Sequence, residues 1–525
     1  MYMRLLTVVC VFLLAVPGNC FNSGWSGKIA SMLESRGKGG GVKSFYEKQQ
    51  YKPVWITDNG WTTAAKQALT LLQQADREGL NPKDYQTAIT TAQSAEESPE
   101  AAARAEIELT RQFLQYIDDV RNGRFNPKLA DRQLVMKPDP VNPVELLSQG
   151  IAQGPENTTW MMDLPPHYDQ YKRLRALLQT FAGRVQEQEV LQIPKGTVLK
   201  FEESSPHVLT LRVMLRRKGD LLENNDRGGT TFDEDLELAV KIFQKRHDLE
   251  VDGVIGPQTL GVLNKTPRDH VKQIIISMER WRWMPRDPGQ RYIQVNIAGF
   301  ELFAVENNQV QLTSPIIVGL AYRETPVFTA PMTDIKFNPS WHVPFSIATR
   351  DKLPKIRRDP SYLTRKGYVL YNSAGQRISP HSVNWGGVSR GNWRYKLRQT
   401  PGSHNALGKI RFTIKNNFRV FLHSTPDVHL FEKSVRTFSS GCIRVKKVEQ
   451  LAAFVLNNPS EWPLTRVQNA MAGNKTNRVY LKQNLPTHIT YFTVWVGDDG
   501  TARFFDDVYG QDQQIWDALR KQRAV

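Results

Sequence analysis

The chain has 525 residues, of which 40% are hydrophobic and 10% aromatic, and this composition excludes a wholly disordered or collagen-like protein. A chain of this length is too long for one core, so we expect about two to four domains. The 69 Lys and Arg outnumber the 52 Asp and Glu, and the formal net charge of +17 suits a polyanionic partner: nucleic acid, anionic lipid or an acidic cell-wall polymer.

The first 20 residues have the pattern of a secretory signal peptide. Arg4 precedes an apolar run from Leu5 to Val16, and Pro17-Gly18 ends that run. The run is shorter than the roughly 20 apolar residues of a membrane span, and no second long apolar stretch follows it. We therefore expect an exported protein, cleaved near residues 18–20, with no transmembrane segment in the mature chain and no nucleic-acid partner.

Cysteine usage agrees with export. The 3 cysteines, Cys10, Cys20 and Cys442, are too few for a disulfide framework, which is typical of a bacterial envelope protein. Because Pro17-Gly18-Asn19 matches poorly the residues that precede a lipid-modified cysteine, we do not expect a lipid anchor at Cys20. Cys442 then lies nearly alone in an oxidising compartment, where it is either buried and inert or kept for its thiolate.

Residues 21–195 are predicted to form a helical scaffold domain. One helix is expected after the cap residue Thr62, and a second, over 100–117, after Ser98-Pro99, a cap followed by a first-turn proline. A third is expected over 168–184. These segments hold apolar residues at helical spacing, and we find no catalytic constellation in them.

Residues 205–265 are predicted to form a small helical module. Apolar residues share one face of a helix over 236–243, and Asp252-Gly253 and Gly256-Pro257 are typical of tight turns. The ordered string Phe243-Gln244, Leu249, Val251-Asp252-Gly253, Gly256 and Thr259 resembles the peptidoglycan-binding modules. That resemblance implies a three-helix fold that binds cell-wall peptidoglycan.

From about residue 270 the pattern changes to strands and predicts a β-rich domain over 270–525. Apolar and polar residues alternate over 292–298 and 301–306, and Asn307-Asn308 indicates a hairpin turn. A basic, turn-rich stretch at about 350–400 interrupts this pattern. We interpret it as an insertion that covers the sheet.

The candidate chemistry lies between His423, at the end of an apolar strand, and Cys442, 19 positions later. A cysteine is nucleophilic only as its thiolate, so His423 is the candidate base and Arg444 adds a positive charge. Ser439-Ser440-Gly441 are small residues that allow backbone N–H groups to converge near the sulfur and stabilise an oxyanion. Either the Ser424 hydroxyl or a backbone carbonyl is expected to orient the imidazole.

In this order and in an exported chain, these residues resemble the L,D-transpeptidase catalytic domain (YkuD type), whose signature is a His, a gap of roughly fifteen residues and Ser/Thr-His-Gly-Cys. In this chain Ser440 lies where the signature has its second His, so His423 is the only expected general base. Ser-Ser-Gly-Cys, with the segments 337–344 and 401–409, resembles the large, scaffold-bearing YcbB-type branch. The resemblance implies a multidomain α+β protein: a helical scaffold, a peptidoglycan-binding module and a β-rich catalytic domain with a capping lobe.

The resemblance also implies a mechanism and site residues. Cys442 attacks the third residue of a stem tetrapeptide, meso-diaminopimelate, so that D-Ala leaves, a thioester remains, and the amine of a second stem resolves it into a cross-link. The N–H groups of Ser440, Gly441 and Cys442 form the oxyanion hole. For Arg444 two roles stay open: it contacts a substrate carboxylate, or it braces the cysteine loop by hydrogen bonds, which we favour. Further candidates for the substrate groove are Asn338, Trp341 and Trp385. We expect no cofactor and no metal, because the other histidines lack metal-ligand spacing.

Three alternatives stay open at this point. Water as acceptor makes the same acyl-enzyme an L,D-carboxypeptidase, and a lipoprotein amine as acceptor anchors protein to the wall. The non-enzymatic alternative is a wall-binding scaffold. The expected partners are peptidoglycan stem peptides and glycan, with other cell-wall synthesis proteins, in the periplasm of a Gram-negative bacterium. Carbapenems are expected to acylate Cys442.

Overall fold

The computed structural model describes residues 25–35, 40–57, 60–136, 140–185, 191–247 and 249–521. The predicted signal peptide, with Cys10 and Cys20, lies outside these residues. The chain divides into two compact units: one holds residues up to 126, 138–183 and 274–286, and the other holds 127–137, 184–273 and 287 onward. Among the described helices, none has the length and apolar composition that a bilayer crossing requires.

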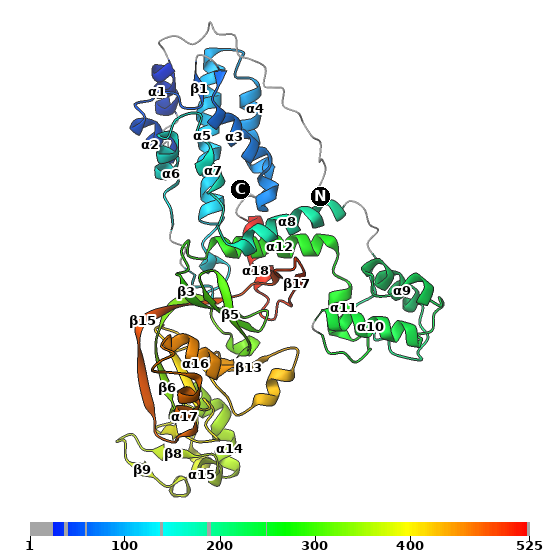
Figure 1. The fold of residues 1–525 in the computed structure, drawn as a ribbon, viewed down its shortest axis with the longest axis vertical. Helices are drawn as coiled ribbons and strands as arrows, with labels where there is room; N and C mark the ends of the chain where they lie inside the picture. Colours follow the sequence, from blue (N-terminus) through cyan, green and yellow to red (C-terminus); the bar gives the residue numbers. More distant parts are fainter. Residues whose placement is uncertain are drawn as a thin grey trace. The chain divides into compact units, whose positions relative to one another are not determined.

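The first unit is helical and is built around the long helix α5 (Pro99–Arg121) (Figure 1). The Ser98 hydroxyl accepts a hydrogen bond from the backbone N–H of Ala101 (3.1 Å), so α5 begins where the sequence predicted. Thr62 caps α3 in the same way. The other elements of this unit are α1 (Trp25–Ser35), α2 (Gly40–Lys48), β1 (Ile56–Thr57), β2 (Gly60–Trp61), α3 (Thr63–Gln73), α4 (Gln86–Gln93), α6 (Pro143–Ile151), α7 (Thr159–Met162) and α8 (Asp169–Arg184).

A buried carboxylate attaches the segment 54–56 to α5. Glu106 is fully buried, and its carboxylate accepts hydrogen bonds from the backbone N–H groups of Val54 (2.6 Å), Trp55 (3.1 Å) and Ile56 (3.1 Å). Burial raises the pKa of Glu106 to about 7, and these donors oppose the rise. Three consecutive backbone donors are thereby satisfied inside the core.

The strand-rich region begins later than residue 270. Residues Pro267–Arg282 form helix α12, and Ile274, Met278 and Trp281 are buried at helical spacing along it. Residues 274–286 belong to the first unit, and the first strand of the second unit is β3 (Arg291–Asn296). Strand preference of the isoleucines at 274–276 is therefore overridden by the helical period of the apolar residues around them.

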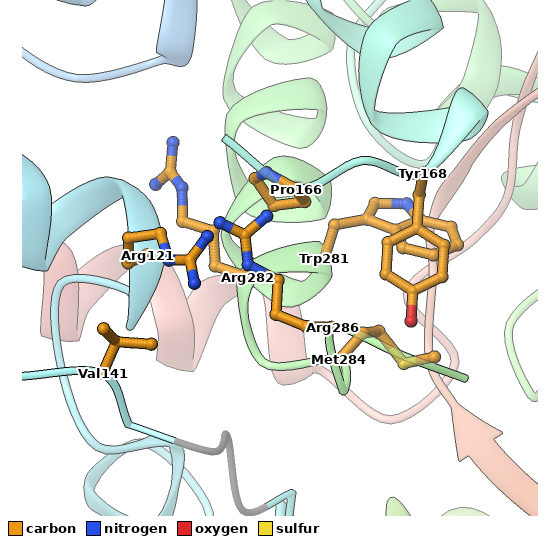
Figure 2. Close-up of a pocket in the computed structure, with 8 residues that line it drawn as sticks. All are labelled: Arg121, Val141, Pro166, Tyr168, Trp281, Arg282, Met284 and Arg286. Carbon is orange, nitrogen blue, oxygen red and sulfur yellow. The ribbon is translucent and has the colours of Figure 1, made fainter. Parts of the chain in front are cut away.

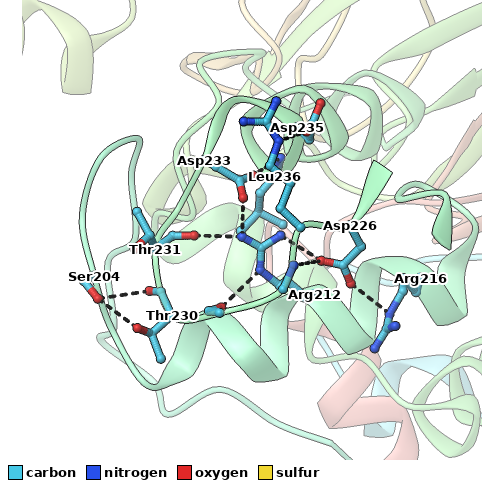
Figure 3. Close-up of polar contacts among 12 residues, drawn as sticks. Ser204, Arg212, Arg216, Asp226, Thr230, Thr231, Asp233, Asp235 and Leu236 are labelled. Carbon is cyan, nitrogen blue, oxygen red and sulfur yellow. Dashed lines mark hydrogen bonds and ion pairs between the residues drawn. The ribbon is translucent and has the colours of Figure 1, made fainter. Parts of the chain in front are cut away.

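Helices α9 (His207–Lys218), α10 (Glu234–Arg246) and α11 (Pro257–Leu263) form a small module with its own apolar core. The Arg212 side chain is 2% exposed and donates to the carboxylates of Asp226 (2.8 Å) and Asp233 (2.5 Å) and to the carbonyls of Gly229 and Thr231 (Figure 3). The buried guanidinium thus joins the 226–233 loop to α9.

Hydrogen bonds of one side chain, Gln244, connect the residues of the motif over 243–259. The Gln244 amide donates to Asp252 (2.7 Å), to the Val254 carbonyl (3.0 Å) and to the Thr259 hydroxyl (3.1 Å), and its oxygen accepts the Gly253 N–H (2.9 Å). Gly253 has φ +74°, a conformation that favours glycine. The spacing between Gln244 and Thr259 therefore preserves one buried hydrogen-bond network that closes the turn between α10 and α11.

Within the described residues of the second unit, nine strands form one sheet in the order β13-β5-β14-β12-β11-β6-β15-β3-β4, and a further pairing of β4 with β5 closes it on itself. Asn307 and Asn308 both have positive φ, so the predicted hairpin turn is confirmed between β4 and β5. The remaining bounds are β4 (Glu301–Glu306), β5 (Gln309–Gly319), β6 (Phe328–Phe337), β11 (Ile410–Ile414), β12 (Leu422–His423), β13 (Thr437–Ser439), β14 (Ile443–Val445) and β15 (Asn477–Thr490).

Elements after and beside this sheet complete the domain. Strand β15 is long and runs beside β6 in Figure 1. The other elements are helices α16 (Val448–Leu456), α17 (Leu464–Ala472) and α18 (Gln511–Lys521) and the hairpin of β16 (Val494–Val496) and β17 (Ala502–Phe504).

The predicted insertion is a lobe with its own sheet and core. Its strands pair in the order β7-β10-β8-β9, and Ile356, Leu363 and Leu370 are buried together in it. The lobe begins at residue 341 rather than 350, because β7 pairs with β10. Its elements are β7 (Trp341–His342), α13 (Phe345–Ile347), α14 (Leu353–Arg358), α15 (Ser361–Arg365), β8 (Tyr368–Tyr371), β9 (Arg377–Ile378) and β10 (Lys396–Gln399).

Candidate active site

Strand register brings the predicted catalytic residues to neighbouring strands. β12 and β14 are parallel, with Leu422 paired to Ile443 and His423 paired to Arg444. Leu422 and Ile443 are fully buried and point to the core, so His423 and Arg444 share the opposite face. Cys442 directly precedes β14 and lies two positions before Arg444. The Ile443 N–H donates to the Phe421 carbonyl (3.1 Å), which holds the cysteine loop against the strand of the histidine.

The His423 imidazole is held in one tautomer. The ring is 5% exposed, and its Nδ1 lies 2.6 Å from the Ser424 carbonyl oxygen, which only accepts, so Nδ1 carries the proton. Nε2 is then the unprotonated nitrogen of the neutral ring, and the Leu407 backbone is a second hydrogen-bond partner beside the ring. Burial, together with the Arg444 charge, lowers the pKa of His423 to about 3. The ring is therefore neutral and able to accept a proton at physiological pH.

The Cys442 thiol is protonated at rest. Burial of the sulfur raises the pKa of Cys442 to about 11, and the Phe421 N–H and the Arg411 and Arg444 guanidinium groups oppose this rise. The Sγ lies 3.8 Å from the Arg419 carbonyl, which accepts from the thiol. Both the thiol and the imidazole are therefore neutral at rest, and nucleophilic attack requires proton transfer during the reaction rather than a preformed ion pair.

One of the three N–H groups predicted to stabilise an oxyanion already has a hydrogen-bond acceptor. The Gly441 N–H already donates to the Ser439 hydroxyl (3.1 Å), and the Gly441 carbonyl accepts from the Thr325 hydroxyl (2.9 Å). This leaves the N–H groups of Ser440 and Cys442 as candidate oxyanion donors. Ser439 shapes the loop, in which Gly441 has φ +107°, a conformation that favours glycine.

Arg444 and Ser424 support the site. Arg444 forms an ion pair with Asp427 (3.1 Å), which braces the loop that follows the histidine. The Ser424 hydroxyl does not orient the imidazole. It accepts the N–H groups of Lys409 (2.7 Å) and Ile410 (3.2 Å), and the carbonyl of Ser424 takes the orienting role.

Sequence reasoning missed Arg411. It is paired directly with His423 across β11 and β12, and its guanidinium lies 4.7 Å from the Phe421 ring centre. The alternation of polar and apolar residues over 410–414 predicts a strand, but nothing local to it indicates that residue 411 faces the site. Arg323, which contacts Ser440 in the cysteine loop and Asp351 in the lobe, was also missed, because both partners are distant from it in the sequence.

Two of the predicted groove residues are buried. Trp385 is 4% exposed in the core of the lobe, where its indole N–H donates to the Pro380 carbonyl (2.7 Å). Asn338 is 1% exposed and donates to the Ala470 carbonyl (2.7 Å). Both residues are structural, because neither presents a side chain to substrate. Trp341 is partly exposed, and the Lys352 ammonium lies 5.7 Å from its ring centre.

A separate pocket lies in the helical unit (Figure 2). Arg286 donates to the carbonyls of Pro165 and Leu164 (both 2.8 Å), and Arg121 donates to the Asp163 carbonyl (3.4 Å). These guanidinium groups hold the 163–165 turn.

Among the residues that the structure describes, no group of three or more His, Cys, Asp or Glu side chains is arranged to hold a metal ion.

Comparisons with known proteins divide the chain in the same way. Family models match residues 40–178 ("Scaffold domain"), 204–263 ("Putative peptidoglycan binding domain") and 290–480 ("L,D-transpeptidase catalytic domain"). A curated relative from Haemophilus influenzae, described as "Putative L,D-transpeptidase", is 33% identical over 235 residues. The match covers 44% of this chain and 47% of the relative, so the chain spans about half of that relative's length.

Two solved structures are also similar. A crystal structure of an L,D-transpeptidase from Stackebrandtia nassauensis has 10% identity and a TM-score of 0.21, covering 55% of this chain and 96% of its own. A second, from Xylanimonas cellulosilytica, has 15% identity and a TM-score of 0.15, covering 57% of this chain and 100% of its own. At these TM-scores neither supports a structural argument.

The chain is therefore a multidomain α+β protein that combines a helical scaffold domain, a peptidoglycan-binding domain and a β-rich catalytic domain. Residues 290–480 are similar to the L,D-transpeptidase catalytic domains of the YkuD type. The resemblance inferred from the motifs is confirmed.

Proposed function

We propose that the protein is a peptidoglycan L,D-transpeptidase that joins two stem peptides through a thioester on Cys442. One observation supports the proposal: the ladder pairs His423 with Arg444, two positions after Cys442, and the Ser424 carbonyl holds the proton on Nδ1, which leaves Nε2 as the basic nitrogen. A thiol that is neutral at rest needs such a base at the moment of attack.

In the acylation step, Nε2 of His423 takes the thiol proton while the sulfur attacks the carbonyl of the third residue, meso-diaminopimelate. The carbonyl oxygen becomes an oxyanion, for which the Ser440 and Cys442 N–H groups are the donors. The bond to the terminal D-Ala then breaks. The imidazolium returns its proton to the leaving amine, and a thioester remains.

In the second step, the side-chain amine of another stem's diaminopimelate attacks the thioester. His423 removes a proton from the attacking amine, and the Cys442 sulfur leaves and regains a proton. The products are a cross-link between two third residues and the free enzyme. Water competes for the thioester, so a transferase needs a covered site, and the lobe that begins at residue 341 is the candidate cover.

The accessory domains support a wall substrate. Residues 204–263 match a peptidoglycan-binding domain, and the net charge of +17 suits stem peptides that end in carboxylates. We place the protein outside the cytoplasm, in the periplasm of a Gram-negative bacterium, with stem peptides and glycan as partners.

The test is mass analysis of muropeptides after incubation with a purified disaccharide-tetrapeptide. We expect third-to-third cross-links and release of D-Ala, and neither product with Cys442→Ala, which still binds sacculi. Release of D-Ala without cross-links, even with a lipoprotein amine or a second stem as acceptor, overturns the proposal in favour of an L,D-carboxypeptidase. Transfer to the lipoprotein amine alone points to wall anchoring. Sacculus binding without turnover leaves only a wall-binding scaffold.

A further inference from the structure

Arg323 contacts both the cysteine loop and the lobe. It lies at the end of a short helical turn (Ala321–Arg323) after β5, and its two terminal nitrogens donate to both carboxylate oxygens of Asp351 (2.7 and 2.8 Å). The nitrogen that donates at 2.7 Å also donates to the Ser440 hydroxyl oxygen (2.9 Å). Asp351 belongs to the helical turn Ala348–Lys352 of the lobe, and Ser440 lies two positions before Cys442.

This ion pair is stronger than an ordinary surface pair. The Arg323 and Asp351 side chains are 17% and 35% exposed, and their geometry is bidentate. The hydrogen bond to Arg323 lowers the pKa of Asp351, and the hydrogen bond to Asp351 raises the pKa of Arg323. Lysine offers no planar fork, so it is not an equivalent replacement for an arginine that bridges two partners.

The segment that carries Arg323 holds the cysteine loop at further points. The Leu320 N–H donates to the Ser439 carbonyl (3.0 Å), and the Thr325 hydroxyl donates to the Gly441 carbonyl (2.9 Å). These two contacts attach the loop to the sheet, whereas Arg323 adds the connection to the lobe. A change at Arg323 therefore leaves the loop attached while it separates the loop from the lobe.

We propose that Arg323 is a positioning residue that couples docking of the lobe to the geometry of the cysteine loop, through Asp351 on one side and Ser440 on the other. The proposal rests on the acyl transfer proposed above. A covering lobe protects a thioester only when it is closed over the site. Because the Arg323 guanidinium binds both Asp351 of the lobe and Ser440 of the cysteine loop, closure of the lobe and alignment of the loop occur together.

The test measures acylation of Cys442 by a carbapenem, by intact-mass spectrometry, and hydrogen exchange of residues 345–358. Arg323→Ala is expected to slow acylation about 10- to 100-fold and to speed exchange in the lobe. Asp351→Asn is expected to speed the same exchange with a smaller loss of rate. In a Ser440→Ala background, Arg323→Ala is expected to cost less, because the two residues act together.

Two further variants separate a positioning role from a merely structural one. The swap Arg323→Asp with Asp351→Arg is expected to restore lobe protection but not the acylation rate, since no guanidinium then approaches Ser440 from residue 323. Arg323→Lys, which keeps the charge and the fold, is expected to give an intermediate rate. The matched control is Arg365→Ala, which removes the exposed partner of Asp359 within the same lobe.

The inference is overturned if Arg323→Ala behaves like Arg365→Ala, or if the effects of Arg323→Ala and Ser440→Ala simply add. Failure of the proposed acyl-enzyme has a different signature, because the wild-type protein would then form no carbapenem adduct on Cys442. Failure of cross-linking alone is seen in the muropeptide products and leaves the adduct in place. A change in unfolding midpoint that tracks the rate loss across all variants also counts against a positioning role.

Discussion

His423 and Arg444 are direct partners in the parallel ladder between β12 and β14, so a buried imidazole lies beside a guanidinium. Burial and this positive neighbour both favour the neutral ring, and burial favours the neutral thiol of Cys442. The resting site is thus an uncharged pair, and the proton moves only when substrate is attacked. This relationship gives the first predictions.

Alkylation of Cys442 by iodoacetamide is expected to be slow at pH 7 and to rise about tenfold per pH unit up to pH about 11, because only the thiolate reacts. The measurement is the second-order rate constant of alkylation, followed by mass spectrometry between pH 6 and pH about 10. Within the described residues Cys442 is the only free cysteine, so the adduct is assigned to it. A plateau of high reactivity below pH 7 would indicate a preformed thiolate–imidazolium pair and contradict this prediction.

His423→Gln is expected to slow carbapenem acylation about 10²- to 10⁴-fold, because the thiol loses its general base. Acylation by the wild type should stay active well below pH 6, since the His423 pKa is lowered to about 3 and the ring remains neutral. His404→Gln is the matched control, because His404 is exposed whereas His423 is buried. Equal rates for the two variants would remove His423 from the mechanism.

Arg411→Met is expected to raise the Cys442 pKa further and to slow alkylation several-fold at a given pH, because one of two charges that favour the thiolate is lost. Its control is Arg466→Met, since Arg466 makes the same kind of contact, 4.4 Å from the Trp462 ring centre. The measurement is the rate of Cys442 alkylation against pH in both variants, and only Arg411→Met is expected to shift it. An unchanged profile in Arg411→Met would mean that its charge is screened from the sulfur.

Ser424→Ala is expected to destabilise the catalytic domain by about 1–3 kcal/mol, because the N–H groups of Lys409 and Ile410 lose their acceptor. Urea unfolding monitored by tryptophan fluorescence measures the change. Ser460→Ala removes an exposed hydroxyl that donates to Asn458 and should be close to neutral. Equal stability of the two variants would show that water replaces the Ser424 hydroxyl.

Arg212→Met is expected to cost the peptidoglycan-binding module about 1–3 kcal/mol, because Asp233 loses its buried partner, Asp226 keeps only Arg216, and the Gly229 and Thr231 carbonyls lose their donor. Sacculus binding should fall while Cys442 acylation persists. Arg227→Met is the control, because Arg227 and its partner Asp235 are more exposed. Loss of both activities in Arg212→Met would mean that the module and the catalytic domain unfold together.

The sequence by itself determined the features that depend on close neighbours along the chain. Thr62 and Ser98 accept from N–H groups three positions later, and Asn307-Asn308 turns a hairpin, so local chemistry was sufficient. The strand pattern expected from residue 270 was wrong over Pro267–Arg282, because packing of the apolar face in the helical unit outweighs strand preference.

Only the tertiary structure decided how distant residues meet. The motif named His423 and Cys442, but the register of β11, β12 and β14 decides that Arg411 faces them, and Arg323 reaches Ser440 from 117 positions away. Trp385 was a candidate for the substrate groove because it lies in the predicted covering insertion, yet it is buried in the core of the lobe. Side-chain type sets what a residue is able to do, whereas strand pairing and burial set which partners and which dielectric surround it.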